Sequence, residues 1–545
     1  MVDKLSGSEF RFRRNESIGE PDAESDELFL SQCFVDTGDF ETLIDCSKPQ
    51  RILVGRTGAG KSALIANLKN SEDNVIEITP ENLSLNFISN SDMLSTLEKA
   101  GVKLDIFYSL LWKHVFTVEL LRYKYDLSNE ENTKKWSFSF LSALNKKDQT
   151  KERALNYIRD WGDKFWYQTE YRIKEVTQKL EGELKSSLGT NIELLKSETN
   201  IGIKGSEEKK FEVISKAQSV VNSIQVKLLS DVMRLLAEEV FNDPKQKYYV
   251  VIDKLDENWV ESELRYRLIR SLIETVKSFR VIPNVKIVVA LRLDLLRSVF
   301  ERTRDSGFQE EKYQSLLLPI HWDKRVLEDL LNKRVAKFTS EQYTKRPLTL
   351  RELFPESISR ERFVDYLFNR TLYRPRDAIA FVNECLKQAY GQTKIMVQTV
   401  RLAEIEYSAQ RFDYLCYEWG DHFPNLSQYL PLLEKMPNSF KLSSMSKLKI
   451  DEFCLQHCIN DSENSKDPII RAGNAYLNNN SLHAFIIVLV KALFQIGAIG
   501  IKTDSFSGQI WSFLGTRTPS DGQIKPTSEI FVHPMLWSRL GVNPK

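Results

Sequence analysis

The segment "RILVGRTGAGKSALIANL", residues 51–68, decides the fold of this chain. Gly55, Gly60, Lys61 and Ser62 match the pattern G-x-x-x-x-G-K-[S/T]. An apolar run at 51–54 precedes the glycine turn, and an apolar pattern of helical spacing follows it to about residue 68. A strand that enters a glycine-rich turn and a helix that leaves it are the context in which this pattern forms a phosphate-binding loop.

Each residue type in this loop has a physical task. Glycines let main-chain N–H groups turn inward, and these groups, with the N-terminus of the helix, bind phosphate oxygens. Lys61 is expected to contact the β- and γ-phosphates, and the Ser62 hydroxyl to bind Mg²⁺. The residues expected to hold the nucleotide are Gly55, Arg56, Thr57, Gly58, Ala59, Gly60, Lys61, Ser62 and Ala63.

Acidic residues follow the next strongly apolar strand, "KYYVVID" at 247–253. We expect Asp253, at its end, to hold Mg²⁺ together with Ser62. Asp256 and Glu257 come on the next turn. Glu257 is expected to orient or deprotonate the attacking water, with Asp256 as a second acidic ligand or orienter. The alternative is that both are solvated turn residues.

Two arginines complete the predicted site. Arg292 follows the buried strand "VKIVVAL" at 285–291, where it is expected to contact the γ-phosphate or Asp256. Its alternative is a surface ion pair. Arg376 lies at the start of a predicted helix, in "LYRPRDAIAF", and is expected to reach the nucleotide from a helical domain. A proline-initiated helix with flanking charges would show the same pattern.

Strands predicted at 51–54, 74–79, 247–253 and 285–291 alternate with helices, which predicts an α/β P-loop NTPase core with a parallel sheet. Near the C-terminus, a helix, a short strand at 509–515, and a second short strand and a final helix within 529–542 follow the order of a winged-helix module. The expected domains are a flexible tail at 1–30, the core at 31–310 with a helical insertion at 100–245, a helical lid at 311–410, and a winged-helix-like domain at 411–545.

Two of these assignments leave alternatives open. The polar residues 1–30 are also compatible with a docking arm. Within the insertion, helical patterns at 151–188 and 211–236 flank an alternating segment at 191–205. This order indicates either a helical arm with a hairpin at its tip or a helical subdomain folded onto the sheet.

Composition limits the function further. The net charge of +1 gives no overall bias toward nucleic acid or an anionic membrane. Residues 441–545 carry 11 Lys/Arg against 8 Asp/Glu, a weaker basic excess than a groove-reading face normally has. The apolar run that begins at His483 is interrupted by Lys491 and Gln495 and is short for a membrane span. We therefore expect a cytoplasmic protein that does not bind membranes and keeps its six cysteines as free thiols.

Four segments together resemble the STAND and KAP branch of P-loop NTPases, relatives of AAA+ ATPases that are often encoded in anti-phage defence regions. The segments are "GRTGAGKSAL", "VVIDKLDENW", "ALRLDLL" and the closing "EIFVHPMLWSRLGV". The resemblance implies Walker A at 55–62, the Walker B acid at Asp253, a catalytic acidic pair at Asp256 and Glu257, sensor 1 at Arg292 and sensor 2 at Arg376. AAA+ proteins more often carry a polar amide at sensor 1, and "RPRD" departs from the Gly-x-Pro turn of many STAND proteins.

The function expected on these grounds is an ATPase that uses ATP and Mg²⁺ and acts as a nucleotide-dependent switch or assembly platform in anti-phage defence. Its expected partners are further copies of the chain, a separate effector protein, or both. ATP is preferred over GTP because "LNKKDQ" at 144–149, which matches the guanine-reading pattern, lacks the D-x-x-G segment upstream. Two alternatives are a nucleotide-controlled DNA-binding protein that uses the winged helix, and a nucleotide-bound scaffold that does not hydrolyse ATP.

Overall fold

The computed structural model describes residues 11–80, 104–127, 149–162, 215, 226–257, 259–260, 262–304, 309–342, 347–459, 465–479, 481–515 and 517–544. The chain divides into two compact units. Unit 1 contains Met1–Val35, Thr57–Gly60 and His321–Lys545, and unit 2 contains Asp36–Arg56 and Lys61–Ile320. The predicted alternating segment at 191–205 lies outside the described residues.

Unit 2 is built on a five-stranded sheet of order β2-β3-β4-β1-β5, in which every pair of neighbours is parallel. Its strands are β1 (Ile52–Gly55), β2 (Val75–Ile78), β3 (Tyr248–Ile252), β4 (Val285–Arg292) and β5 (Leu317–Pro319). The first four lie where the apolar runs predict them. The carboxyl ends of parallel strands meet at one edge of a sheet, so the loops after β1, β3 and β4 are brought to the same edge.

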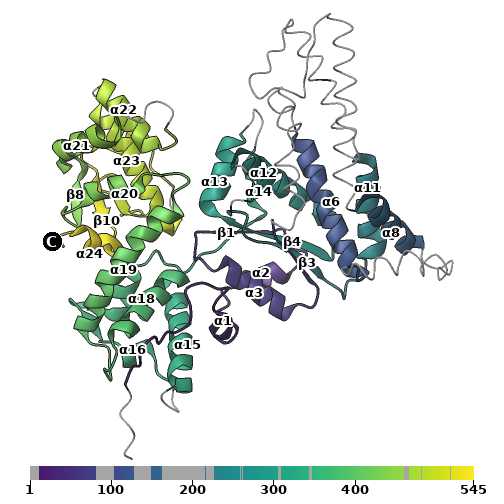
Figure 1. Ribbon diagram of the computed structural model, residues 1–545, viewed down its shortest axis with the longest axis horizontal. Helices are drawn as coiled ribbons and strands as arrows, with labels where there is room; N and C mark the ends of the chain where they lie inside the picture. Colours follow the sequence, from purple (N-terminus) through teal and green to yellow (C-terminus); the bar gives the residue numbers. More distant parts are fainter. Residues whose placement is uncertain are drawn as a thin grey trace, which may run out of the picture. The chain divides into compact units, whose positions relative to one another are not determined.

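The middle strands of this sheet are buried on both faces, which explains their continuous apolar sequences. All five residues of β3 and the first seven of β4 are buried. The described helices of unit 2 are α2 (Asp39–Ile44), α3 (Lys61–Ser71), α6 (Asp105–Lys124), α8 (Gln149–Trp161), α11 (Val226–Leu235), α12 (Ser262–Ser278), α13 (Leu293–Arg302) and α14 (Glu311–Gln314). Figure 1 shows α2 and α3 on one side of the sheet and α6 and α12 on the other.

The helices on the α6 side share one apolar core with the sheet. Alternate residues of β3, namely Tyr248, Val250 and Ile252, belong to the same cluster as the buried faces of α6 and α12. Trp112 of α6 donates its indole N–H to the Leu268 carbonyl of α12 at 2.9 Å. Within the predicted insertion at 100–245, the described helices α6, α8 and α11 and the π-helical turn Leu236–Val240 pack together with this core.

Two polar side chains, Tyr249 and Lys286, anchor α2 on the opposite face, and Arg51 bonds to the neighbouring strand β4. Tyr249 of β3 donates its hydroxyl to the Ile44 carbonyl at 2.7 Å. Lys286 of β4 is fully buried and donates from Nζ to the carbonyls of Thr42 and Asp45, both at 2.8 Å. Arg51 donates to the Val285 carbonyl at 3.2 Å. Burial lowers the pKa of Lys286 to about 7.

Unit 1 is mainly helical. Its longer helices are α1 (Glu27–Cys33), α15 (Lys324–Gln342), α17 (Phe363–Asn369), α18 (Pro375–Gln388), α19 (Val397–Glu418), α21 (Lys447–His457), α22 (Pro468–Asn479) and α23 (Leu482–Ile496). Its short helices are α16 (Leu350–Leu353), α20 (Leu426–Tyr429) and α24 (Trp537–Leu540). One contiguous core joins α15, α18 and α19 to α23 and the C-terminal strands. The domain boundary predicted at 410 falls inside α19 and therefore does not separate two structural elements.

A small antiparallel sheet of order β8-β10-β9 closes the chain, and two-residue strands β6 (Ser357–Ile358) and β7 (Glu361–Arg362) form a separate hairpin. The C-terminal strands are β8 (Ser439–Lys441), β9 (Ile499–Lys502) and β10 (Glu529–Val532). Figure 1 shows α21, α22 and α23 gathered around β8 and β10. The strand predicted at 509–515 is wrong: Ile510 forms an isolated bridge to Ile501, and Ser512–Leu514 is a 3-10 turn.

The apolar run that begins near His483 forms the buried helix α23, which ends at Gly497 in the left-handed conformation. Within the described parts of the chain, no helix has the length and apolarity that a membrane span requires.

The N-terminal residues from Arg11 pack against the helices of unit 1. Phe12 and Ile18 are buried in its core. The Ile18 N–H donates to Asn383 Oδ1 of α18 at 2.9 Å, and Asn383 donates to the Gly19 carbonyl at 2.8 Å. Asp26 and Arg334 of α15 form a buried ion pair at 2.5 Å. Over residues 11–26 the segment therefore has the contacts of a docking arm, the alternative to a flexible tail.

Candidate functional site

Lys61 is the first residue of α3 and directly follows the glycine turn. Its side chain is almost fully buried, and Nζ donates to the carbonyls of Gly55 and Arg56, both at 3.1 Å. The ammonium is therefore held at the start of the loop, on the side where β1 ends. This is the position from which a lysine of this motif reaches bound phosphate.

Ser62 and Asp253 meet although they are far apart in sequence. Ser62 Oγ donates to Asp253 Oδ2 at 2.9 Å, and Asp253 Oδ1 accepts from the Lys254 N–H at 2.8 Å. Lys254 has φ of 62°, the left-handed region that residues with a side chain seldom adopt. This turn carries the chain away from β3 directly after the carboxylate, which leaves the carboxylate directed at the start of α3.

Burial shifts both charged groups of this site toward their neutral forms. Desolvation lowers the pKa of Lys61, opposed by the nearby carboxylates of Asp253 and Asp256. Desolvation also raises the pKa of Asp253, opposed by the hydrogen bonds from Lys254 and Ser62. Each group is thus incompletely compensated. An anion near Lys61 and a cation near Asp253 would each restore the charged form, which is what a metal–phosphate ligand supplies.

Arg292 is the last residue of β4 and lies beside Gly55 in the sheet register. Its guanidinium makes a two-pronged contact with Asp294, with Nε to Oδ1 at 3.1 Å and a terminal nitrogen to Oδ2 at 2.6 Å. A longer contact of 3.4 Å joins it to Asp256. The predicted pairing of Arg292 with Asp256 is thus present, whereas Asp294 was missed although it lies in the quoted segment "ALRLDLL".

Arg265 of α12 holds the main chain of the acidic turn that follows Asp253. This buried arginine donates to the main-chain carbonyls of Asp256 at 3.2 Å and Glu257 at 3.1 Å. The side chain of Glu257 is exposed. The turn therefore has a fixed backbone, while its carboxylate remains accessible to solvent, as a group that activates water must be.

The loop tip, Thr57–Gly60, belongs to unit 1, and its carbonyls accept hydrogen bonds there. Arg374 donates to the Thr57 carbonyl at 2.7 Å, and Trp322 Nε1 donates to the Ala59 carbonyl at 2.8 Å. The N–H of Arg376 reaches the Gly58 carbonyl at the longer distance of 3.4 Å.

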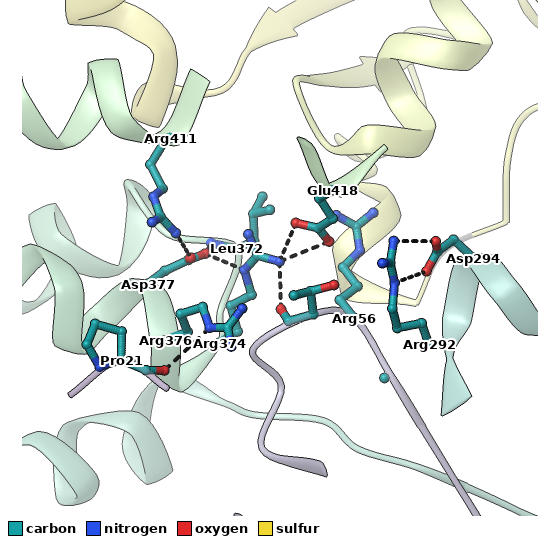
Figure 2. Close-up of polar contacts among 12 residues, drawn as sticks. Pro21, Arg56, Arg292, Asp294, Leu372, Arg374, Arg376, Asp377, Arg411 and Glu418 are labelled. Atoms are coloured by element: carbon teal, nitrogen blue, oxygen red, sulfur yellow. Dashed lines mark hydrogen bonds and ion pairs between the residues drawn. The ribbon is translucent and has the colours of Figure 1, made fainter. Parts of the chain in front are cut away.

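Arg374 is itself fixed by a buried network (Figure 2). It donates to Asp377 at 2.7 Å and to both oxygens of Glu418, at 2.9 and 3.1 Å. Asp377 also accepts from Arg411 at 2.5 Å and from the Leu372 N–H at 3.1 Å. The two arginines lower the pKa of Asp377 to about 2 despite its burial. The sequence analysis selected Arg376 and missed Arg374, Asp377 and Glu418.

Gly58 is required where it stands. Its φ is +75°, and a Cβ added there would lie 2.6 Å from Cβ of Arg376. A side chain would therefore be both strained and in collision with α18. The guanidinium of Arg376 donates to the Pro21 carbonyl at 3.4 Å (Figure 2). It also donates to Asp22 at 3.4 Å. Its predicted contact with nucleotide stays a prediction.

The residues of the loop fit a nucleotide with its metal. The Thr57 hydroxyl oxygen is buried and has no hydrogen-bond partner among the described residues. The Ser62 hydroxyl and the Asp253 carboxylate are hard oxygen ligands of the kind Mg²⁺ prefers. In the described parts of the chain, no cluster of three or more His, Cys, Asp or Glu side chains has the geometry of a metal site. Mg²⁺ is commonly bound through one or two protein ligands together with phosphate oxygens and water, so the pair Ser62 and Asp253 fits it.

Three similarities to known proteins can be set beside this geometry. Residues 325–416 match the model of the FunZ-associated C-terminal helical domain. The chain is 21% identical over 540 residues to the "Putative transposon gamma-delta 80.3 kDa protein" of Escherichia coli (strain K12), across 97% of this chain and 68% of that protein. The Walker-type ATPase PABY2304 of Pyrococcus abyssi is similar in structure, with 12% identity, a TM-score of 0.36, and coverage of 96% of this chain and 98% of that one.

The sheet of unit 2 identifies the class of fold. Its five parallel strands are covered by helices on both faces, and the glycine-rich turn follows strand β1. This arrangement fits an α/β P-loop NTPase core.

Proposed function

We propose that this chain binds ATP with Mg²⁺ at residues 55–63 and hydrolyses it to ADP and phosphate. The observation that carries the proposal is the 2.9 Å contact between Ser62 Oγ and Asp253 Oδ2, next to the buried ammonium of Lys61. A hydroxyl and a carboxylate in direct contact at the start of a glycine-loop helix form the pair that holds the metal of a bound nucleoside triphosphate.

Each residue of the candidate site has a role that follows from its position. Lys61 and the loop amides bind the phosphates, and Ser62 and Asp253 would hold the metal, which would supply positive charge that neutralises the phosphates. Glu257, exposed on a turn braced by Arg265, orients the attacking water and accepts its proton. Arg292, oriented by Asp294, stabilises negative charge that develops on the transferred group.

Two variants test binding and hydrolysis separately. Lys61→Ala is expected to abolish measurable ATP binding in a fluorescent-nucleotide titration, because it removes the cation that contacts phosphate. Glu257→Gln is expected to keep ATP affinity and to slow phosphate release by about 100-fold or more, since it removes the base. Glu263→Gln is the matched control, because Glu263 is an exposed glutamate on α12 that pairs with Arg302. If Glu257→Gln and the wild type bind ATP and release phosphate equally slowly, the chain is a non-hydrolysing scaffold.

We further propose that ATP occupancy acts as a switch that controls assembly of the chain or a separate effector. The contacts of the loop tip with Trp322 and Arg374, all within unit 1, support this, because a ligand in the loop would alter groups that these residues hold. The role in anti-phage defence is supported only by the sequence resemblance. The mass of the protein in solution with ATP, with ADP and without nucleotide tests the switch, which requires that the assembly state differ between nucleotides.

A nucleotide-controlled DNA-binding role is the second candidate. The order of helices and strands from β8 to β10 favours it, because α21 to α23 precede the β9–β10 pair as in a winged-helix module. The weak basic excess of residues 441–545 counts against it. DNA retention at rising salt tests it, since binding through several phosphates weakens steeply with salt. Retention that does not depend on salt, or no retention at low salt, excludes this role.

A further inference from the structure

Three consecutive carbonyls of the phosphate loop, those of residues 57–59, accept hydrogen bonds from other residues of unit 1. Thr57 O accepts from Arg374 at 2.7 Å, and Ala59 O accepts from Trp322 at 2.8 Å. Between them, Gly58 O accepts the longer bond of 3.4 Å from the main chain of α18. We call Arg374 and Trp322, the two strong donors, the outer brace.

The outer brace determines which way the loop amides point. In a trans peptide the C=O and the N–H of the same unit are directed oppositely. When the carbonyls of Thr57 and Ala59 point outward to Arg374 and Trp322, the N–H groups of Gly58 and Gly60 point to the inner side of the loop. Among the described residues, neither amide has a protein partner. The inner side is where phosphate oxygens bind.

The donors of the outer brace are held more rigidly than a surface contact would be. Arg374 is buried between the carboxylates of Asp377 and Glu418, and both ion pairs are shorter than 3 Å. The Trp322 ring lies over the loop, 3.5 Å from where a Cβ on Gly60 would stand. Gly60 has φ of +94°, so a glycine at this position permits both the turn and the approach of the ring.

We propose that Arg374 and Trp322 are positioning residues that hold the phosphate loop in its binding shape by fixing its outward carbonyls. The proposal rests on the proposed function, because it assumes that phosphate binds the inner amides. It assigns Arg374 a role through the backbone of the loop and not through the γ-phosphate. The inner amides contact phosphates that ATP and ADP share. Loss of the outer brace therefore weakens both nucleotides equally.

The test uses Trp322→Phe and Arg374→Lys in the full-length chain. Phenylalanine keeps an aromatic ring, smaller than the indole, and removes the N–H, and lysine keeps the charge and removes the guanidinium fork. Each variant is expected to bind ATP and ADP about three- to tenfold more weakly, as expected for one lost hydrogen bond. The turnover number at saturating ATP is expected to stay within about twofold of the wild type, since neither residue contacts the reacting atoms.

Matched controls exist within unit 1. Trp537→Phe removes an indole N–H that donates to the Val532 carbonyl at 2.8 Å, away from the loop. Arg370→Lys changes a buried arginine that pairs with Glu404 and donates to the Tyr366 carbonyl at 3.1 Å. Both controls lose the same kinds of bond, so a general loss of stability affects them as well. They are expected to bind both nucleotides as the wild type does.

A second measurement does not depend on nucleotide. In the nucleotide-free protein, the rate of tryptic cleavage at the Arg56–Thr57 bond is expected to rise several-fold in Trp322→Phe and Arg374→Lys and to be unchanged in the controls. Wild-type cleavage rates and affinities in both variants overturn the proposal, and so does an affinity loss for ATP without a loss for ADP. If the wild type binds neither nucleotide, the proposed function fails, whereas the cleavage rates still decide whether the outer brace holds the loop.

Discussion

Replacing Asp377 by asparagine tests the buried network behind the phosphate loop most directly. Asp377 is fully buried and accepts hydrogen bonds from Arg374, from Arg411 and from the Leu372 main chain. Asparagine has nearly the same shape and carries no charge. Two buried guanidinium groups, those of Arg374 and Arg411, would then lose the carboxylate that they share, while Glu418 would still pair with Arg374.

The structure indicates a large loss of stability for this substitution. Breaking a buried ion pair by removing one partner costs about 3–5 kcal/mol, because the remaining charge stays buried without compensation. The pKa shift of Asp377 gives a second and lower value for the same loss of stability. The pKa of Asp377 falls from 3.8 to about 2 on folding, and the shift corresponds to about 2–3 kcal/mol. Because the folded-state pKa is depressed, this stability is present above about pH 4 and is lost as the pH falls toward 2.

Urea unfolding of unit 1, followed by tryptophan fluorescence, measures the effect. If the free energy of unfolding falls by about 3 kcal/mol per molar urea, a loss of about 3–5 kcal/mol lowers the midpoint by at least about 1 M. Asp365→Asn is the matched control. Asp365 also contacts two cations, Arg362 at 2.7 Å and Lys324 at 3.1 Å, but the Arg362 side chain is 73% exposed. Exposed pairs contribute about 0–1 kcal/mol, so this control is expected to shift the midpoint little.

Equal midpoints for Asp377→Asn and Asp365→Asn would refute the argument, because burial would then make no difference. A midpoint for Asp377→Asn within about 0.3 M of the wild type would refute it as well. The stability difference between Asp377→Asn and the wild type is also expected to shrink between pH 4 and pH 2, since the wild-type carboxylate is then protonated. A difference that stays constant over this range would show that the charge is not responsible.

Three further predictions concern the site and the sheet. Asp294→Ala is expected to lower the rate of ATP hydrolysis by about 10- to 100-fold with unchanged ATP affinity, because Arg292 loses the carboxylate that orients it; an equal loss of affinity would contradict this role. Burial raises the pKa of Asp253, so Mg²⁺-dependent ATP affinity, measured by titration, should fall as the pH is lowered. The fall should begin at a higher pH than protonation of an exposed aspartate would give, and Asp253→Asn should remove the pH dependence. Burial lowers the pKa of Lys286 to about 7, so above pH 7 the unfolded chain binds more protons than the folded chain. The free energy of unfolding of unit 2, measured in urea, should therefore rise from pH 7 toward 10.5 by up to about 1.4 kcal/mol per pH unit. Lys286→Met should abolish this rise.

Much of the core fold could be predicted from local patterns. Strands β3 and β4 are recognisable because both faces of a central parallel strand are buried, which leaves an uninterrupted apolar run. The three-residue strand β5 carries no such signal and was missed. The strand expected at 509–515 fails because a short apolar segment with aromatic residues fits a 3-10 turn equally well.

The parts of the site that are close in sequence were also predictable, and those that depend on chain packing were not. The pattern G-x-x-x-x-G-K-S and the carboxylate after an apolar strand identify Lys61, Ser62 and Asp253 as a candidate site. Only the order of the parallel strands, in which β4 lies between β1 and β3, brings Ser62 and Asp253 to hydrogen-bond distance.

The outer brace could not have been found in the sequence. Arg374 and Arg376 are separated by one proline, and nothing in their composition says which donates to the loop. The structure decides it, because Asp377 and Glu418 direct Arg374 to the Thr57 carbonyl, whereas the arm at Pro21 binds Arg376. Local periodicity encodes strands and a glycine loop since both depend on neighbouring residues. The contacts of Arg374 join residues 44 positions apart, at Glu418, and 317 positions apart, at Thr57, and only the packing of the chain brings those together.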